Sequence, residues 1–185
     1  MTRILASTAL ALTLALPVVA DEVTDALQSA LNAYEEGDIQ YAMEELAFAQ
    51  QLMQGMKAGS LAGFLPEGLD GWTREIDDEA GQGMAMLGGT AAAANYSNGS
   101  ESFTITVMAD SPMIAGMAGM FSNPMLMAAA GGIVRVGREK FVDQDGEIVG
   151  LIGGRVLIQA SGGPSDVMID HLKEMDFREL SRFGS

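Results

Sequence analysis

The feature that most constrains the fold is an uncharged stretch in the second half of the chain. From Pro112 to Val134 the sequence reads PMIAGMAGMFSNPMLMAAAGGIV and contains no charged residue. Its length suffices for a membrane span, but residues 122–124 (Ser, Asn, Pro) interrupt it and leave apolar pieces of only about nine residues on either side. We therefore expect two short helices, with Ser122 or Asn123 capping the second helix and Pro124 in its first position.

An uncharged stretch of this kind has to be kept from water. It can cover one face of a sheet as ordinary core, or it can bind a hydrophobic small molecule or the apolar surface of an envelope protein. The second possibility defines a candidate binding site. Its residues are Met113, Met117, Met120, Phe121, Met125 and Met127.

Methionine is frequent, with 14 in the chain, and thioether sulfur is a ligand that selects Cu(I). A Cu(I) site is therefore an alternative hypothesis, and no other cofactor is expected. Methionine is also an adaptable filler of irregular apolar surfaces, which is the simpler interpretation. The candidate Cu(I) ligands are Met117, Met120, Met125 and Met127. The single histidine, His171, is expected on the polar side of a late helix, at the surface.

Charge and cysteine content exclude several classes of protein. The chain has 10 Lys and Arg against 25 Asp and Glu, a formal net charge of −15, and no cysteine. A nucleic-acid partner or an anionic lipid surface would require a basic footprint, which this chain lacks. Disulfides, thiolate metal sites and a cysteine nucleophile are also excluded.

The N-terminus has the pattern of a cleavable signal peptide. Arg3 precedes an apolar core from Ile4 to Leu16, Pro17 breaks that core, and small residues lead up to Ala20. We expect residues 1–20 to be removed on export and the protein to lie in the bacterial periplasm, where a chain of this size can fold without disulfides.

Residues from Glu22 onward follow a helical pattern. Apolar side chains recur at spacings of three and four, Gly37 ends the first run, and Asp38 is placed to cap a second helix. Four glycines and a proline then occur within residues 57–71. The sequence predicts an antiparallel helical hairpin over residues 21–57 and a linker over residues 58–71.

This hairpin resembles a tetratricopeptide repeat over about residues 22–56. The matching residues are Ala30, Tyr34, Gly37, Asp38, Ala42, Leu46 and Ala49. The resemblance implies that small residues let two helices approach closely; in that family, several stacked repeats form a peptide-binding groove. Here Gln54 stands where the family has a closing proline, and no second repeat follows. Packing on the neighbouring domain, partner binding and self-association remain open for this hairpin.

The sequence pattern of residues 72–185 predicts an α+β domain. Strand patterns cover residues 71–78, 90–96, 102–108, 133–142, 147–152 and 155–160. The turn signals between them are Asn98-Gly99, Asp145-Gly146 and Gly153-Gly154. A closing helix should run from Ser165, its cap, to about Met175, and Phe177, Leu180 and Phe183 should dock as another turn. The predicted fold is thus α+β: a two-helix hairpin, a mostly antiparallel sheet of five or six strands, two inserted apolar helices and a C-terminal helix.

Carboxylates are too numerous to nominate a catalytic pair. One group consists of Glu75, Asp77, Asp78 and Glu79, and another of Asp143, Asp145 and Glu147. The second group lacks the spacing of a calcium loop and is better explained as a turn. A hydrolase with unidentified carboxylates remains an alternative, but the leading prediction is a non-enzymatic exported binding or accessory protein, with the oligomeric state left open.

Overall fold

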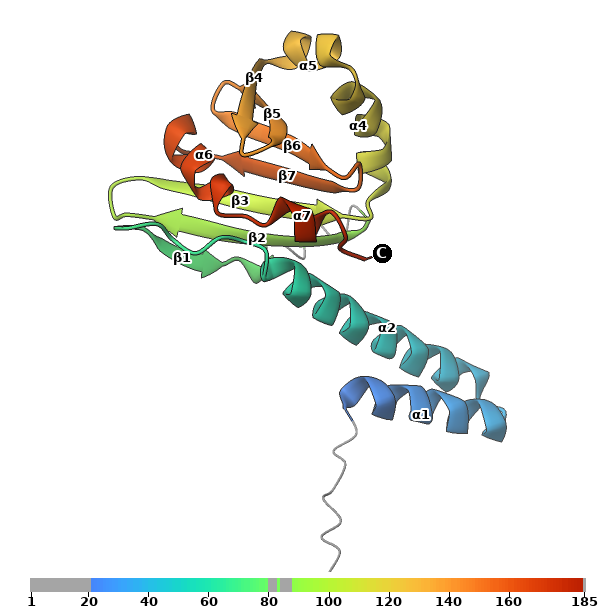
Figure 1. Cartoon of the computed structure of the whole chain (residues 1–185). Helices are drawn as coiled ribbons and strands as arrows, with labels where there is room; N and C mark the ends of the chain where they lie inside the picture. Colours follow the sequence, from blue (N-terminus) through green and yellow to red (C-terminus); the bar gives the residue numbers. More distant parts are fainter. Residues whose placement is uncertain (1–20, 80–82, 84–87, 185) are drawn as a thin grey trace, which may run out of the picture. The chain divides into compact units, whose positions relative to one another are not determined.

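The computed structural model describes residues 21–79, 83 and 88–184 of the chain (Figure 1). It contains two compact units, one extending to Leu52 and the other beginning at Met53. The predicted signal peptide lies outside the described residues. The α+β class predicted from the sequence is confirmed.

The first unit is a helical hairpin. Helix α1 (Glu22–Glu36) begins at Asp21, whose side chain accepts a 2.9 Å hydrogen bond from the Thr24 N–H. It ends at Gly37, whose φ of 86° is the left-handed conformation that glycine adopts without strain. The Asp38 carboxylate then accepts from the Tyr41 N–H at 3.1 Å and caps α2 (Ile39–Ala62). The α1–turn–α2 order and both turn residues were predicted from the sequence.

Helix α2 is longer than predicted. It continues to Ala62, so residues 58–62, which were assigned to the linker, are helical. This extension is stabilised by Leu61, which is completely buried in the core of the second unit. Burial of one apolar residue outweighs the weak helix propensity of the glycines in this segment.

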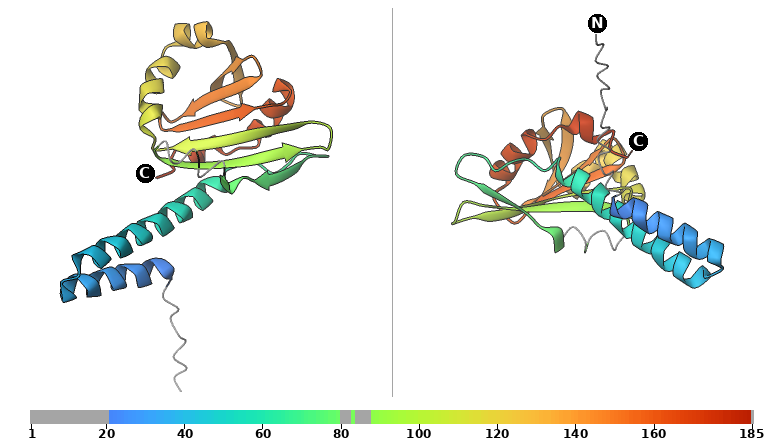
Figure 2. Two further views of the ribbon diagram at one scale, coloured as in Figure 1. Left: turned by 180° about the vertical axis from the view of Figure 1, so that it is seen from behind. Right: turned by 90° about the horizontal axis from the view of Figure 1, so that it is seen from below.

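The second unit is built on a seven-stranded antiparallel sheet with the order β1-β2-β3-β7-β6-β5-β4 (Figures 1 and 2). The strands are β1 (Thr73–Ile76), β2 (Thr90–Ser97), β3 (Ser102–Ala109), β4 (Gly132–Val136), β5 (Glu139–Gln144), β6 (Glu147–Ile152) and β7 (Val156–Ser161). The predicted hairpin around Asn98-Gly99 is confirmed, since β2 and β3 pair with Ser97 opposite Ser102. The Asn98 side chain stabilises the turn by accepting from the Ser100 and Glu101 N–H groups.

The sheet has seven strands instead of the expected five or six, because one segment that was predicted as a single strand forms two strands. Residues 133–142 contain β4 and β5, which pair antiparallel with Val136 opposite Glu139. Gly137, at a φ of 60°, is the first residue of the two-residue turn between them. A positive φ at this position gives a tight hairpin turn, and glycine permits it.

One face of the sheet carries the main core. Alternate residues such as Tyr96, Ile105 and Ile158 are completely buried there, beneath α6 (Ser165–Lys173) and α7 (Phe177–Leu180). Phe177, Leu180 and Phe183 all pack on this core, as predicted for the C-terminal tail. The predicted cap at Ser165 was wrong. Pro164 precedes the helix and no side chain caps it.

The opposite face is partly polar and partly covered. Thr104 and Thr106, predicted on a wet face, are half-buried there. Ala91, Met108 and Leu157 form a second, smaller core cluster on the same face. The first inserted helix, α4 (Pro112–Ser122), supplies Ile114 to that cluster, and α5 (Pro124–Ala130) follows it.

Candidate functional site

The uncharged insertion forms the two predicted short helices. The Ser111 hydroxyl accepts from the Met113 N–H at 3.3 Å and starts α4. The Asn123 N–H donates to the Met120 carbonyl at the end of α4, while its side chain accepts from the Met125 N–H at 3.0 Å and starts α5. The two helices meet at a bend of 104°, and in the described part of the chain no single helix is long and apolar enough to cross a membrane.

Part of the insertion is ordinary core. Ile114 and Met127 are each only 2% exposed. Ile114 belongs to the second core cluster, and Met117 and Phe121 pack against it from the same helix at spacings of three and four. These contacts fix α4 on the sheet, so three of the six predicted binding residues, Met117, Phe121 and Met127, serve at least in part as packing residues.

Three large apolar side chains of α4 and α5 are exposed to solvent. Met125 is 79% exposed, Leu126 is 49% exposed and Met113 is 44% exposed. Met120 is half-buried. We call Met125 and Leu126, which are adjacent on α5, the exposed apolar patch of the insertion; Met113 lies apart from them, at the start of α4. The structure therefore divides the predicted site into anchoring residues and solvent-facing residues, a distinction that hydrophobicity alone did not reveal.

The four candidate Cu(I) ligands do not share one environment. Met125 and Met127 are two residues apart on α5, which places them on different sides of a helix, and one is exposed while the other is buried. Met117 and Met120 are both half-buried on α4. The Cu(I) alternative stays a prediction.

Basic residues lie beside the insertion, on the neighbouring strands. Ile133 and Arg135 alternate with Val134 and Val136, which face the main core, so they lie on the face that carries α4 and α5. Arg135 is directly opposite Lys140 on β5, and both are exposed. Like charges facing each other across strands are destabilising, and in a chain of net charge −15 this local positive charge complements an acidic ligand or surface.

The chain enters the insertion through a charged anchor at Asp110. Its backbone has a φ of 57°, and its carboxylate pairs with Lys57 at 2.7 Å and with Arg155 at 3.0 Å. Arg155 also donates to the Gly184 carbonyl at 3.3 Å. The Lys57 hydrogen bond is the main cause that lowers the pKa of Asp110, and Arg155 adds to it. This anchor joins the start of the insertion to α2, β7 and the C-terminal tail.

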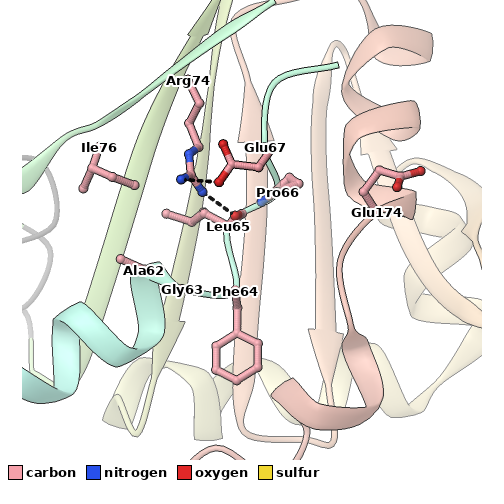
Figure 3. A pocket seen from close by; sticks show the side chains of 9 residues that line it. All are labelled: Ala62, Gly63, Phe64, Leu65, Pro66, Glu67, Arg74, Ile76 and Glu174. Carbon is pink, nitrogen blue, oxygen red and sulfur yellow. Dashed lines mark hydrogen bonds and ion pairs between the residues drawn. The ribbon is translucent and has the colours of Figure 1, made fainter. Parts of the chain in front are cut away.

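Two pockets lie elsewhere in the second unit. One, of about 500 Å³, is lined by Ala62, Gly63, Phe64, Leu65, Pro66, Glu67, Arg74, Ile76 and Glu174 (Figure 3). Its arginine is already engaged, donating to the Leu65 carbonyl at 2.8 Å and pairing with Glu67 at 2.6 Å. The other, of about 820 Å³, is lined by Arg138, Glu139, Ile152, Gly153, Glu174, Met175, Asp176, Phe177, Arg178 and Ser181. Neither pocket includes a predicted site residue.

His171 is a core residue, and the prediction that it lies at the surface was wrong. It is completely buried, and its ring lies 4.8 to 5.5 Å, centroid to centroid, from the rings of Trp72, Tyr96 and Phe103. The Leu69 N–H donates to Nε2 at 3.2 Å, and Nδ1 lies 2.9 Å from the Val167 carbonyl. Together these contacts assign the proton to Nδ1. Both ring nitrogens therefore serve the fold and join the segment before β1 to α6.

The acidic groups form turns and surface contacts. The Asp143 side chain accepts from the Gly146 N–H at 3.4 Å, and Asp145 adopts a φ of 51°, which confirms the predicted turn. Asp77 accepts a hydrogen bond from Asn95 at 2.9 Å. Over residues 21–79, 83 and 88–184, no group of three His, Asp or Glu side chains is arranged to hold a metal ion.

No protein-family model, curated protein or solved structure matches the chain. The tetratricopeptide resemblance of residues 22–56 therefore stays a prediction, and the insertion remains the predicted binding site.

Proposed function

We propose that the chain is a non-enzymatic binding protein of the bacterial periplasm, in which the α4–α5 insertion docks an apolar surface of an envelope protein. The observation that carries this proposal is the exposure of Met113, Met125 and Leu126 on helices that are capped and anchored. A folded apolar patch that faces water is typical of an interaction site.

The form of the patch favours a protein surface over an enclosed small molecule. Small-molecule sites are concave and bury most of their ligand, whereas Met125 projects from a short outer helix. Methionine adapts its shape to different apolar partners. Arg135 and Lys140, on the same face of the sheet, favour a partner that has acidic groups around its apolar contact.

Photocrosslinking of the full chain in exporting bacterial cells tests the proposal. A benzophenone side chain at position 125 should crosslink to a protein of defined mass. The same group at Ser100, an exposed residue of the β2–β3 turn at the end of β3 that is remote from the insertion, should not. Equal crosslinking from both positions, or none from position 125, would contradict the proposal. If native mass spectrometry instead finds a retained apolar molecule, the ligand is a hydrophobic small molecule.

The matching variant is Met125→Ser with Leu126→Ser. Because both side chains are exposed, unfolding free energy should change by less than about 0.5 kcal/mol. Affinity for the crosslinked partner should fall by about tenfold or more, as expected when central apolar contacts are removed. An unchanged affinity would show that the partner binds elsewhere.

A further inference from the structure

The hairpin unit buries only small residues between its helices. The buried residues of α1 are Ala26, Ala30 and Ala33, and those of α2 within this unit are Ala42 and Ala49. Side chains this short let the two helices approach closely, but they bury little apolar surface. The large apolar side chains of the hairpin lie elsewhere.

Those large side chains lie one residue beyond the buried positions. Along α1, Leu27, Leu31 and Tyr34 follow the three buried alanines, and in α2 Met43 follows a fourth. One residue corresponds to a rotation of about 100° around an α-helix. Each helix therefore carries a stripe of exposed apolar residues beside its stripe of alanines.

The two exposed stripes fall on the same side of the hairpin. A two-fold axis that passes between two antiparallel helices exchanges them, so the same rotation away from the interface leads to the same side of the pair. Figures 1 and 2 show α1 running antiparallel along the N-terminal part of α2. The resulting hairpin face consists of Leu27, Leu31, Tyr34, Ile39, Met43 and Leu46, which are 43% to 65% exposed.

A further rotation of one residue reaches carboxylates. Residues 33–35 (Ala, Tyr, Glu) and 42–44 (Ala, Met, Glu) each lead from the helix interface, across the hairpin face, to an acidic outer edge. Residues 21–52 contain no Lys or Arg. Their acidic residues are Asp21, Glu22, Asp25, Glu35, Glu36, Asp38, Glu44 and Glu45. The hairpin face is thus apolar at its centre and bordered by Glu35 and Glu44, whereas Asp25 and Glu36 lie on the opposite side of the hairpin.

We infer that the hairpin face docks an amphipathic helix of a partner protein whose apolar stripe is flanked by Lys or Arg. Contact between the two apolar stripes buries the side chains that the hairpin leaves exposed to water. The Lys or Arg residues of the partner helix pair with the carboxylates at the edges of the hairpin face. A second copy of the hairpin would place Glu35 and Glu44 against the same two carboxylates, and residues 21–52 of neither copy contain a Lys or Arg to compensate them, which disfavours self-association. An anionic lipid surface is disfavoured for the same reason.

Fluorescence anisotropy with the full chain and two labelled peptides tests this inference. The probe is the Leu/Lys peptide LKKLLKLLKKLLKL, and its counterpart LEELLELLEELLEL has the same apolar stripe with Glu in place of Lys. The Leu/Lys peptide should bind and the Leu/Glu peptide should not. Raising the ionic strength should weaken binding, because salt screens exposed charges. Equal binding of the two peptides, or no binding of either, would overturn the inference.

A matched pair of variants separates docking on the hairpin face from general attraction to an acidic protein. Leu31→Ser with Leu46→Ser removes two side chains of the hairpin face and should weaken binding by about tenfold or more. Tyr41→Ser with Phe48→Ser removes similarly exposed apolar side chains from the other side of α2 and should leave the affinity unchanged. Equal losses in the two variants would overturn the inference.

Two further measurements keep these outcomes interpretable. Circular dichroism should show the same helix content in both variants, because all four positions are exposed. Light scattering should show a monomer for the free chain. A dimer that Leu31→Ser with Leu46→Ser dissociates would assign the hairpin face to a second copy and overturn the inference. The hairpin variants leave Met125 and Leu126 unchanged, so this test is independent of the proposed role of the insertion.

Discussion

At the scale of single residues, Asp110 has the most demanding position. It lies directly between β3 and the segment that leads into α4, its φ of 57° is in the left-handed region, and two cations neutralise its carboxylate. Asp and Asn tolerate this backbone conformation better than most residues. The same side chain thus fits the backbone turn and joins distant segments.

Replacing Asp110 with asparagine should isolate the ionic contribution, because asparagine tolerates the same φ. We expect Asp110→Asn to lower the unfolding free energy by about 1 kcal/mol or less, since the charges it pairs with are partly exposed. The pKa of Asp110 is lowered in the fold, so the stabilisation is present above the ordinary carboxyl pKa of 3.8 and is lost as pH falls through the lower folded value. Urea denaturation at about pH 7 and about pH 3 measures this difference.

The matched control is Asp170→Asn, which removes an exposed pair with Lys173 on one helix. This variant should change the unfolding free energy at neutral pH by no more than about 0.5 kcal/mol. A difference between wild type and Asp110→Asn that persists undiminished at acid pH would contradict the ionic explanation.

For His171, the polarity of the side chain and its position in the helix led to opposite predictions. Its spacing of four from both Val167 and Met175 places it on the inward side of α6, as the helical period alone requires. Its polarity favoured the opposite prediction. The prediction failed because the partners that satisfy both ring nitrogens, at Leu69 and Val167, include one that is distant in sequence and comes near only in the folded chain.

At the scale of elements, Asn123 controls the geometry of the insertion. It ends α4, caps α5 and precedes Pro124, and the residue before a proline avoids the helical conformation. Its φ of −111° and ψ of 108° are extended. One residue therefore separates the two helices and directs the exposed side of α5.

Asn123→Ala should remove the cap and destabilise α5 by about 1 kcal/mol. Hydrogen exchange at residues 125–130 should accelerate, while exchange in β3 should not change. Ser122→Ala is the control, because the Ser122 hydroxyl donates to the Ala118 carbonyl within α4 and caps nothing. Equal acceleration in the two variants would show that Asn123 has no special capping role.

Local turn chemistry determined which elements could be predicted. Asn98-Gly99 and Asp145-Gly146 predicted the β2–β3 and β5–β6 connections, because these residue pairs suit tight turns between strands. The β4–β5 turn was missed because Gly137 lies within one continuous alternating pattern. Similarly, the sequence predicted two capped helices in the insertion but not that Met127 would be buried and Met125 exposed. The side of α5 that faces inward depends on packing between distant segments.

At the scale of the whole molecule, the two units differ in how they are stabilised. The sheet unit has a core that includes Tyr96, Ile105, Phe141 and Leu172, whereas the hairpin buries alanines. Because stabilisation by burial scales with apolar area, the hairpin is the weaker unit.

We therefore expect amide hydrogen exchange in the full chain to be faster in α1 than in β3 and β7, by about two orders of magnitude or more. The Leu/Lys peptide should slow exchange in α1 selectively, since a ligand stabilises the state that it binds. Mass spectrometry of proteolytic fragments provides the measurement. Equal protection in α1 and the central strands would contradict the difference in stabilisation.

The pairing of β3 with β7 has a consequence for the timing of folding. Among the described residues, β1, β2 and β3 adjoin the rest of the sheet only through β7, the last of the seven strands. A ribosome must therefore release most of the polypeptide before the central strand pair can form, and this long sequence separation slows the final assembly. The two halves of the sheet therefore stay separate during synthesis until nearly the whole chain has emerged, and the β3–β7 ladder is the step that joins them.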